Sequence, residues 1–246
     1  MRNDNKKGKL YGIGIGPGDP KLLTLRAKEV LDKVDTIFVP KGSVEGSSYA
    51  RAIIEAVINK PKSIVELTFP MTRDKDVLKR HWQRAAKIIA KDITKAKLAA
   101  FVTIGDPFIY STYVYLLKIF SREFPGIEIE TIPGVASFNA AASRAGIPLV
   151  ERNEKLAILP VTKNLRGLRR FLKEFDTVVL MKVGAKLEKV VRLLNEMGLA
   201  KKSVLISRLG LPNEIVLPDV SLLKDKKLGY LSVIIVKCKK GSFLRW

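Results

Sequence analysis

Short apolar stretches alternate along the chain with longer segments in which apolar residues recur every third or fourth position. The first pattern predicts strands and the second predicts amphipathic helices. Strands are expected over 9–15, 36–39, 64–67, 98–104, 127–132, 156–161, 177–181, 203–207 and 230–237. Strands that alternate with helices are typical of an α/β fold with a largely parallel sheet.

The helical segments lie between these strands. Asp19 and Pro20 are typical of an N-cap and a first helical position, so they predict the start of a helix that reaches Lys33. Ser47 or Ser48 is the expected cap of a helix that ends near Ile58. Further helices are expected over 74–95, 111–120, 137–144, 165–173 and 187–197.

The alternation stops at Gly146-Ile147-Pro148 and then starts again. We therefore expect two α/β domains in series, an N-terminal one over 8–146 and a C-terminal one over 147–240, without a repeat of fixed period. A chain of 246 residues is long enough for each domain to bury a core.

Composition indicates a soluble globular protein, with 47% hydrophobic and 28% charged residues. No apolar run approaches the roughly 20 residues of a membrane span, and the polar start lacks the apolar core of a signal peptide, so a cytoplasmic location without membrane attachment is expected. Cys238 is the only cysteine, which excludes an internal disulfide and a multi-thiolate metal site. We expect no protein-bound metal.

The formal net charge of +21 favours anionic partners. A positive field concentrates nucleic acid, an acidic membrane surface or a polyanionic small molecule alike. The lysines and arginines are scattered along helices rather than gathered in one tail, and a solvated surface that serves solubility is an equally good interpretation.

Two Gly-Asp-Pro turns follow predicted strands, one at 16–20 and one at 105–107. Ligands of open α/β sheets bind at the carboxyl ends of strands, so a crevice lined by both turns is expected. The first turn is not a dinucleotide fingerprint, because Pro17 or Asp19 stands where that motif requires glycine. Proline lacks an N–H and aspartate repels phosphate, so the turn favours a cationic or neutral cofactor.

The stretches GIGIGPGDPKLLTLRA, TIGDPFIYSTYVYL and TIPGVASFNAAA resemble the tetrapyrrole methylase family. FPMTRD and LAILPV are most similar to the precorrin-2 and cobalt-precorrin-2 C20-methyltransferases of that family. The resemblance implies methyl transfer from S-adenosylmethionine to a carboxylate-fringed reduced tetrapyrrole in cobalamin biosynthesis. It also implies two α/β domains with the cofactor in the cleft between them, usually in a homodimer.

The resemblance further implies which residues contact the cofactor. These are Pro17, Ile104, Gly105, Asp106, Ile109, Ala136 and Ser137 from the first domain, with Met181 and Gly210 from the second. The substrate carboxylates would meet cations, for which Arg73, Lys182 and Lys41 are the candidates together with Arg152. A proton must leave the methylated carbon, and Tyr110, Tyr113 or Asp19 is expected to relay it.

Structural alternatives stand beside these roles. Asp19 is equally a helix cap, and the tyrosines at 110, 113 and 115 are typical of a core stripe with at most one member exposed. Other functions within the same fold are methylation of a ribosomal RNA ribose or of a modified protein histidine. A non-catalytic nucleic-acid-binding protein on a methylase scaffold is the remaining alternative, although an aromatic, basic strand face is not evident.

Overall fold

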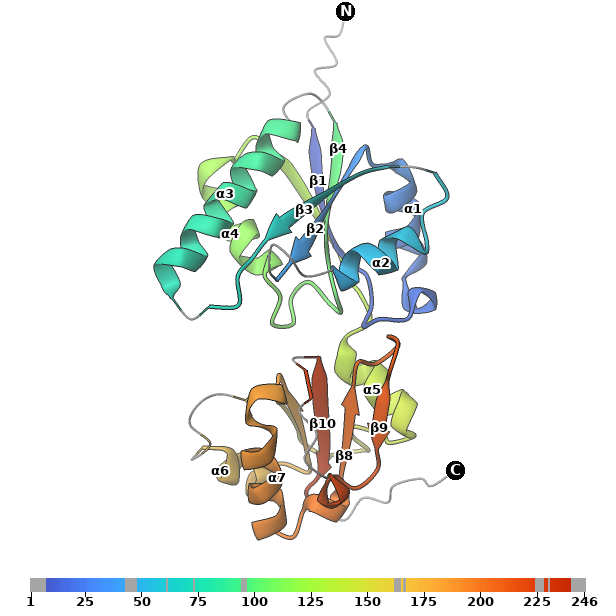
Figure 1. Cartoon of the computed structure of the whole chain (residues 1–246), viewed down its shortest axis with the longest axis vertical. Helices are drawn as coiled ribbons and strands as arrows, with labels where there is room; N and C mark the ends of the chain where they lie inside the picture. The colour runs from blue at the N-terminus through green and yellow to red at the C-terminus, as the bar shows by residue number, and fades with distance from the viewer. Residues whose placement is uncertain are drawn as a thin grey trace, which may run out of the picture. The chain divides into compact units, whose positions relative to one another are not determined.

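A computed structural model describes residues 8–42, 48–60, 62–72, 74–93, 97–161, 165, 167–223, 228–229 and 231–239. The chain divides into two compact units, Met1–Ala136 and Ser137–Trp246, and each has its own sheet (Figure 1). The sequence placed the boundary between 146 and 147. The helix over Ser137–Ala145, α5, contacts a strand of the second unit and is grouped with it.

Five of the described segments form the sheet of the first unit, in the order β3-β2-β4-β1-β5, and all of the pairs are parallel. Parallel neighbours need a crossover between them, which the intervening helices supply. The strands are β1 (Lys9–Gly14), β2 (Thr36–Lys41), β3 (Ser63–Thr68), β4 (Leu98–Thr103) and β5 (Glu128–Ile132).

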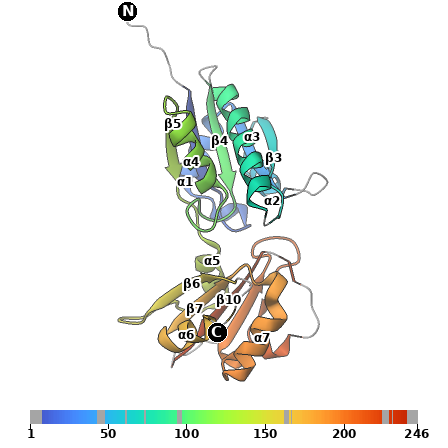
Figure 2. The same cartoon turned by 90° about the vertical axis from the view of Figure 1, so that its left-hand side faces the viewer.

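Helices cover both faces of this sheet. Helices α1 (Leu25–Lys33) and α2 (Tyr49–Glu55) lie on one face, while α3 (Lys75–Ile93) and α4 (Tyr113–Glu123) lie on the other (Figures 1 and 2). Each face has its own apolar cluster. β4 contributes to both clusters, which explains why its sequence is almost entirely apolar.

The predicted helix from Asp19 to Lys33 is wrong at its start. The Asp19 carboxylate accepts the N–H of Lys21 over 2.9 Å, but it caps only the short 3-10 helix Pro20–Leu22. Leu23 is extended, and α1 begins with a new cap, in which Thr24 Oγ1 accepts the N–H of Ala27 over 3.2 Å. The segment is divided into two helices because the backbone of each N-cap residue, Asp19 and Thr24, is extended rather than helical.

The other caps follow the sequence more closely. Ser48 caps α2 by accepting the N–H of Arg51 over 3.2 Å, whereas the alternative Ser47 lies outside the described residues. Asp74 accepts the N–H groups of Asp76 and Val77 at the start of α3. Both caps satisfy amide groups that have no partner within the helix.

The sheet of the second unit has the order β6-β7-β10-β8-β9 among the described residues. β6 and β7 are parallel, but β10 is antiparallel to both of its neighbours and β9 is antiparallel to β8, so the prediction of a largely parallel sheet is wrong for this unit. Its strands are β6 (Leu156–Pro160), β7 (Thr177–Met181), β8 (Ser203–Ser207), β9 (Ile215–Leu217) and β10 (Ser232–Lys237).

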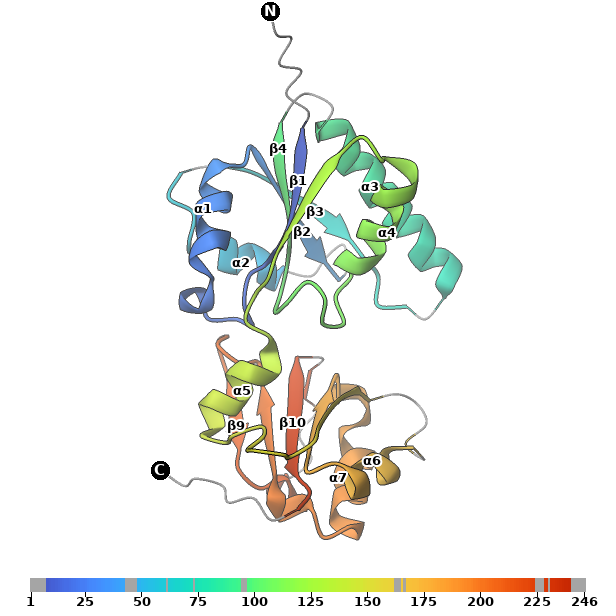
Figure 3. The same ribbon diagram turned by 180° about the vertical axis from the view of Figure 1, so that it is seen from behind.

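Helices α6 (Leu168–Glu174) and α7 (Leu187–Glu196) lie on one face of the second sheet and α5 lies on the other (Figures 1 and 3). Short 3-10 helices occupy Gly184–Lys186, Ala200–Lys202 and Val220–Leu222. The Lys237 side chain is buried and pairs with Glu154 over 3.0 Å, which compensates the charge. Within the described ranges no helix combines the length and the apolar character that a membrane crossing needs.

Candidate functional site

The first sheet changes direction of winding between β1 and β4. From β1 the chain crosses through α1 to β2 and β3, and from β4 it crosses through α4, on the other face, to β5. β1 and β4 are neighbours, and the chain continues from their carboxyl ends to helices on opposite faces of the sheet. Such a switch point is where open α/β sheets bind their ligands, and it is where both Gly-Asp-Pro turns lie.

Backbone groups join the two turns. The N–H of Gly105 donates to the carbonyl oxygen of Gly16 over 2.7 Å, and the two glycines form an isolated antiparallel bridge just beyond the parallel β1–β4 pairing. Gly16 has a φ of 75° and Gly105 a φ of 74°, values in the left-handed region that glycine adopts without strain. These glycines allow both loops to turn sharply while they remain bonded to each other.

The loop after β5 joins the same group through close glycine contacts. A Cβ atom on Gly134 would lie 2.3 Å from the carbonyl oxygen of Gly105, and one on Gly14 would lie 2.6 Å from the nitrogen of Gly134. Side chains are therefore excluded where the three strand ends meet. Gly14 and Gly134 are not among the site residues expected from the sequence, although the Pro-Gly pair after β5 was a signal for the second of them.

Asp106 fastens these loops with both of its carboxylate oxygens. Oδ1 accepts the N–H of Phe108 over 2.9 Å, which closes the turn, and Oδ2 accepts the N–H of Gly134 over 3.1 Å. Hydrogen bonds from backbone N–H groups to a carboxylate are charge-assisted and stronger than neutral ones. The side chain predicted to contact the cofactor therefore also holds the loops after β4 and β5 together.

The predicted cofactor residues of the first unit lie in these loops. Pro17 and Gly105 are buried, whereas the side chains of Ile104, Asp106 and Ile109 are partly exposed. The partly exposed Ala136 follows Gly134 by two residues, whereas Ser137, also partly exposed, begins α5 and belongs to the second unit.

Met181 and Gly210 follow strands of the second unit. Met181 ends β7 and is 9% exposed, while its carbonyl oxygen accepts the N–H of Val161 over 2.9 Å. Gly210 has a φ of 67°, and its N–H donates to Glu214 over 2.8 Å. That hydrogen bond, and after it the Arg144 guanidinium 2.6 Å from the carboxylate, lower the pKa of Glu214 below its usual value.

The predicted proton relays occupy different surroundings. Tyr113 is buried, and its hydroxyl lies 2.6 Å from Thr131 Oγ1, an arrangement typical of a core residue; burial raises its pKa. Tyr110 is 42% exposed at a φ of 52°, and partial burial raises its pKa as well. Tyr115 is also exposed and stacks on Trp82, so the expectation of at most one exposed tyrosine is wrong.

The predicted carboxylate-binding cations are not equivalent. Lys41 ends β2 and forms an ion pair with Glu66 over 3.1 Å, so a substrate carboxylate would compete with a carboxylate already present. Lys182 follows β7 with a φ of 58°, and Arg152 has a φ of 48° in the loop before β6. Arg73 lies outside the described residues.

No cluster of three or more His, Cys, Asp or Glu side chains is arranged to hold a metal in the described part of the chain. Cys238 is partly buried, and burial raises the pKa of its thiol to about 11. A thiol with so high a pKa is protonated at neutral pH and is a poor nucleophile or metal ligand.

Solved structures share this fold. A cobalt precorrin-4 methyltransferase superposes with a TM-score of 0.70 over 93% of this chain and 94% of its own, at 21% identity. A uroporphyrin-III C-methyltransferase from Thermus thermophilus, solved in complex with S-adenosylhomocysteine, superposes with a TM-score of 0.64 over 93% of this chain and 97% of its own, at 20% identity. At these identities the likeness concerns the fold.

Curated relatives are more similar in sequence. A protein of Methanocaldococcus jannaschii named a probable cobalt-precorrin-2 C(20)-methyltransferase is 39% identical over 93% of this chain and 96% of its own length. The cobalt-precorrin-2 C(20)-methyltransferase of Salmonella typhimurium is 32% identical over the same shares. The sequence pattern of the tetrapyrrole (corrin/porphyrin) methylases matches residues 9–222. This match spans most of the chain, and the protein belongs to the tetrapyrrole (corrin/porphyrin) methylase family.

Proposed function

We propose that the protein transfers a methyl group from S-adenosylmethionine to C20 of precorrin-2 or cobalt-precorrin-2, in cobalamin biosynthesis. Relatives named for this reaction align with nearly the whole chain, at 39% and 32% identity for the cobalt-precorrin-2 proteins and 30% for a precorrin-2 C(20)-methyltransferase of a Sinorhizobium species. The chain covers at least 95% of each relative's length, so the proposal extends to the whole enzyme.

The observation that carries the proposal is the junction of three loops held by Asp106. Glycines keep Cβ atoms away from this junction, and the partly exposed Ile104 and Ile109 add apolar surface beside an aspartate. Backbone groups, apolar side chains and a nearby negative charge suit a ligand that combines a thioether-like chain with a cationic sulfur. A phosphate ligand would be repelled by the same carboxylate.

S-adenosylmethionine supplies a methyl group on a positively charged sulfur, which is a good leaving group. The main task of the protein is then alignment, which contributes on the order of 7 to 11 kcal/mol to lowering a reaction barrier. Asp106 serves alignment because one of its hydrogen bonds closes the loop after β4 and the other links that loop to the loop after β5. We assign Ile104, Gly105 and Asp106 to binding, with Met181 and Gly210 as predicted contacts from the second unit.

Tyr110 is our candidate for contact with the substrate among the predicted proton relays. Its raised pKa keeps the phenol protonated at neutral pH, so the hydroxyl is suited to donate a hydrogen bond to a carboxylate. Tyr113 and Asp19 fit structural roles better, since Tyr113 is buried against Thr131 and Asp19 caps a 3-10 helix.

The net charge of +21 supports a polycarboxylate substrate through long-range attraction. Lys182 and Arg73 are the proposed carboxylate contacts, and Lys41 could join them only by exchanging its partner Glu66. A homodimer, a cytoplasmic location and the lack of a resident metal remain predictions from the sequence.

The test is a single-turnover reaction with S-adenosylmethionine carrying a ¹³C-labelled methyl group. We expect precorrin-2 or cobalt-precorrin-2 to gain one labelled methyl group by mass spectrometry, with the label at C20 by NMR. The ring loses one proton from that carbon as the methyl group is added. Label at another carbon would change the assigned position, and no mass gain on either ring would refute the substrate. Label in ribosomal RNA instead would favour the RNA alternative.

A further inference from the structure

The outer face of α3 carries a series of cations, of which Arg80, Arg84 and Lys87 have no ion-pair partner among the described residues. The helix is amphipathic, and its inner residues Ala85, Ala86, Ile89, Ala90 and Ile93 are buried against the sheet. On its outer side Arg80, Arg84, Lys87 and Lys91 are exposed. The helix runs for 19 residues, so this face extends over several turns.

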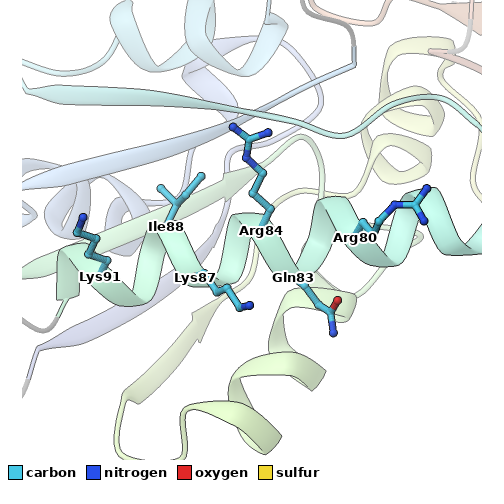
Figure 4. A pocket seen from close by; sticks show the side chains of 6 residues that line it. All are labelled: Arg80, Gln83, Arg84, Lys87, Ile88 and Lys91. Carbon is cyan, nitrogen blue, oxygen red and sulfur yellow. The ribbon is translucent and has the colours of Figure 1, made fainter.

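Two ridges of side chains follow this face. Arg80, Arg84 and Ile88 are spaced four residues apart, and so are Gln83, Lys87 and Lys91. A shallow hollow of about 450 Å³ is lined by these six residues. In Figure 4 Arg84 and Ile88 project from one side of the helix while Gln83 and Lys87 project from the opposite side. We call this feature the α3 groove.

Three of the charges along the α3 groove, those of Arg80, Arg84 and Lys87, lack compensation among the described residues. Within the described ranges no carboxylate lies within ion-pair distance of Arg80, Arg84 or Lys87. Of the helix's own acids that follow the cap, Asp76 stands at its start and Asp92 pairs with Lys97 over 3.6 Å. Like charges four residues apart destabilise a helix, so an anion that enters the groove relieves a repulsion already present.

The shape of the hollow indicates which kind of anion fits. A groove between two rows of residues spaced by four accepts the corresponding ridge of another helix. Residues four apart on such a helix are separated by about 6 Å along the axis, the same rise that separates Arg80 from Arg84. Ile88, which is 39% exposed, gives the groove an apolar centre that a protein side chain can cover and a phosphate chain cannot use.

We propose that the α3 groove docks an acidic amphipathic helix of a partner protein. The partner presents glutamates or aspartates at every fourth position, with an apolar residue that contacts Ile88. A second copy that docks through the same groove is disfavoured as the occupant, because it would place cations against cations. Arginine suits such a surface because its guanidinium binds carboxylates in a bidentate manner.

The probe is a fluorescent synthetic peptide helix with glutamate at every fourth position and a leucine row beside it. Binding to the full chain is measured by anisotropy at several salt concentrations. The double variant Arg84→Glu, Lys87→Glu should bind the peptide about tenfold more weakly, because two attractive contacts become repulsive. Circular dichroism of the double variant establishes that α3 is retained. If this variant does not fold, the double variant Arg84→Gln, Lys87→Gln replaces it in the binding assay.

The matched control is Lys189→Glu with Arg192→Glu on α7, which makes the same charge change at the same spacing on another helix. This variant should retain binding within about twofold, since it changes only the long-range field. An equal loss in both double variants would overturn the proposal in favour of net charge. Groove-dependent binding of single-stranded RNA without binding of the peptide would also overturn it, in favour of nucleic acid.

Discussion

The N–H of Gly134 donates a hydrogen bond to Oδ2 of Asp106 over 3.1 Å, so a carboxylate from the loop after β4 holds the loop after β5. The other oxygen of the same carboxylate accepts the N–H of Phe108. A single side chain thus fixes two of the three loops at the switch point. Mutation of this residue is the most direct test of the candidate site.

Asp106→Ala should weaken binding of S-adenosylhomocysteine more than Asp19→Ala does. The first change removes one hydrogen bond within the turn and one between loops, and it leaves two backbone N–H groups without their partner, at a cost of about 1 to 3 kcal/mol. The second removes one hydrogen bond, to Lys21, within the same turn. Calorimetric titration measures both affinities, and equal values would show that the pocket is assigned to the wrong loops.

Gly134→Ala should destabilise the first unit by about 1 to 3 kcal/mol, because the new methyl group requires the backbone to move. Its Cβ would lie 2.3 Å from the carbonyl oxygen of Gly105. Gly126→Ala is the control, since no atom lies within 4 Å of its added Cβ. Urea unfolding compares the two variants, and similar midpoints would contradict the close packing of the three loops.

Tyr113→Phe should leave kcat nearly unchanged and lower stability by about 1 kcal/mol, through loss of the hydrogen bond between the hydroxyl and Thr131. Tyr110→Phe should instead raise KM, because the hydroxyl of this partly exposed residue is the proposed contact with the substrate. Steady-state kinetics with thermal unfolding separates these effects. A large fall in kcat for Tyr113→Phe alone would restore the buried residue as a catalytic candidate.

Glu214 should make the second unit sensitive to acid. Its pKa is lowered in the folded state by the N–H of Gly210 and by Arg144, so the stability that it contributes is present above the ordinary value of 4.5 and is lost as pH falls through the folded pKa. Glu214→Gln should reduce this loss in urea unfolding followed from neutral to acidic pH. Glu151→Gln is the control, because its carboxylate has no ion-pair partner within the described ranges. Equal pH profiles for both variants would contradict the assignment.

The sequence predicted most strands and helices because their apolar periodicity is strong. β7 and β8 begin and end at the predicted residues. The direction of β10 could not be predicted, because an apolar run does not indicate which strand it pairs with or whether the pairing is parallel or antiparallel. β9 was missed because three residues, all partly exposed, give no clear period.

The parts of the candidate site that depend on short sequence motifs could be predicted. The two Gly-Asp-Pro turns follow buried strands, and their place at a switch point follows from that. Gly134 was not singled out because its role depends on contacts with Gly14 and Gly105, which are distant in sequence. Tyr115 was assigned to a core stripe because spacing alone cannot show that Trp82 stacks on it at the surface.

The position of β10 has a consequence for synthesis of the protein. The strand over Ser232–Lys237, β10, lies between β7 and β8. The second sheet therefore lacks its central strand until these residues have left the ribosome. All strands of the first sheet are complete by Ile132 and can assemble earlier. The nascent chain is therefore expected to carry a finished first unit together with an open second one, whose exposed strand edges are open to wrong pairing until β10 has emerged.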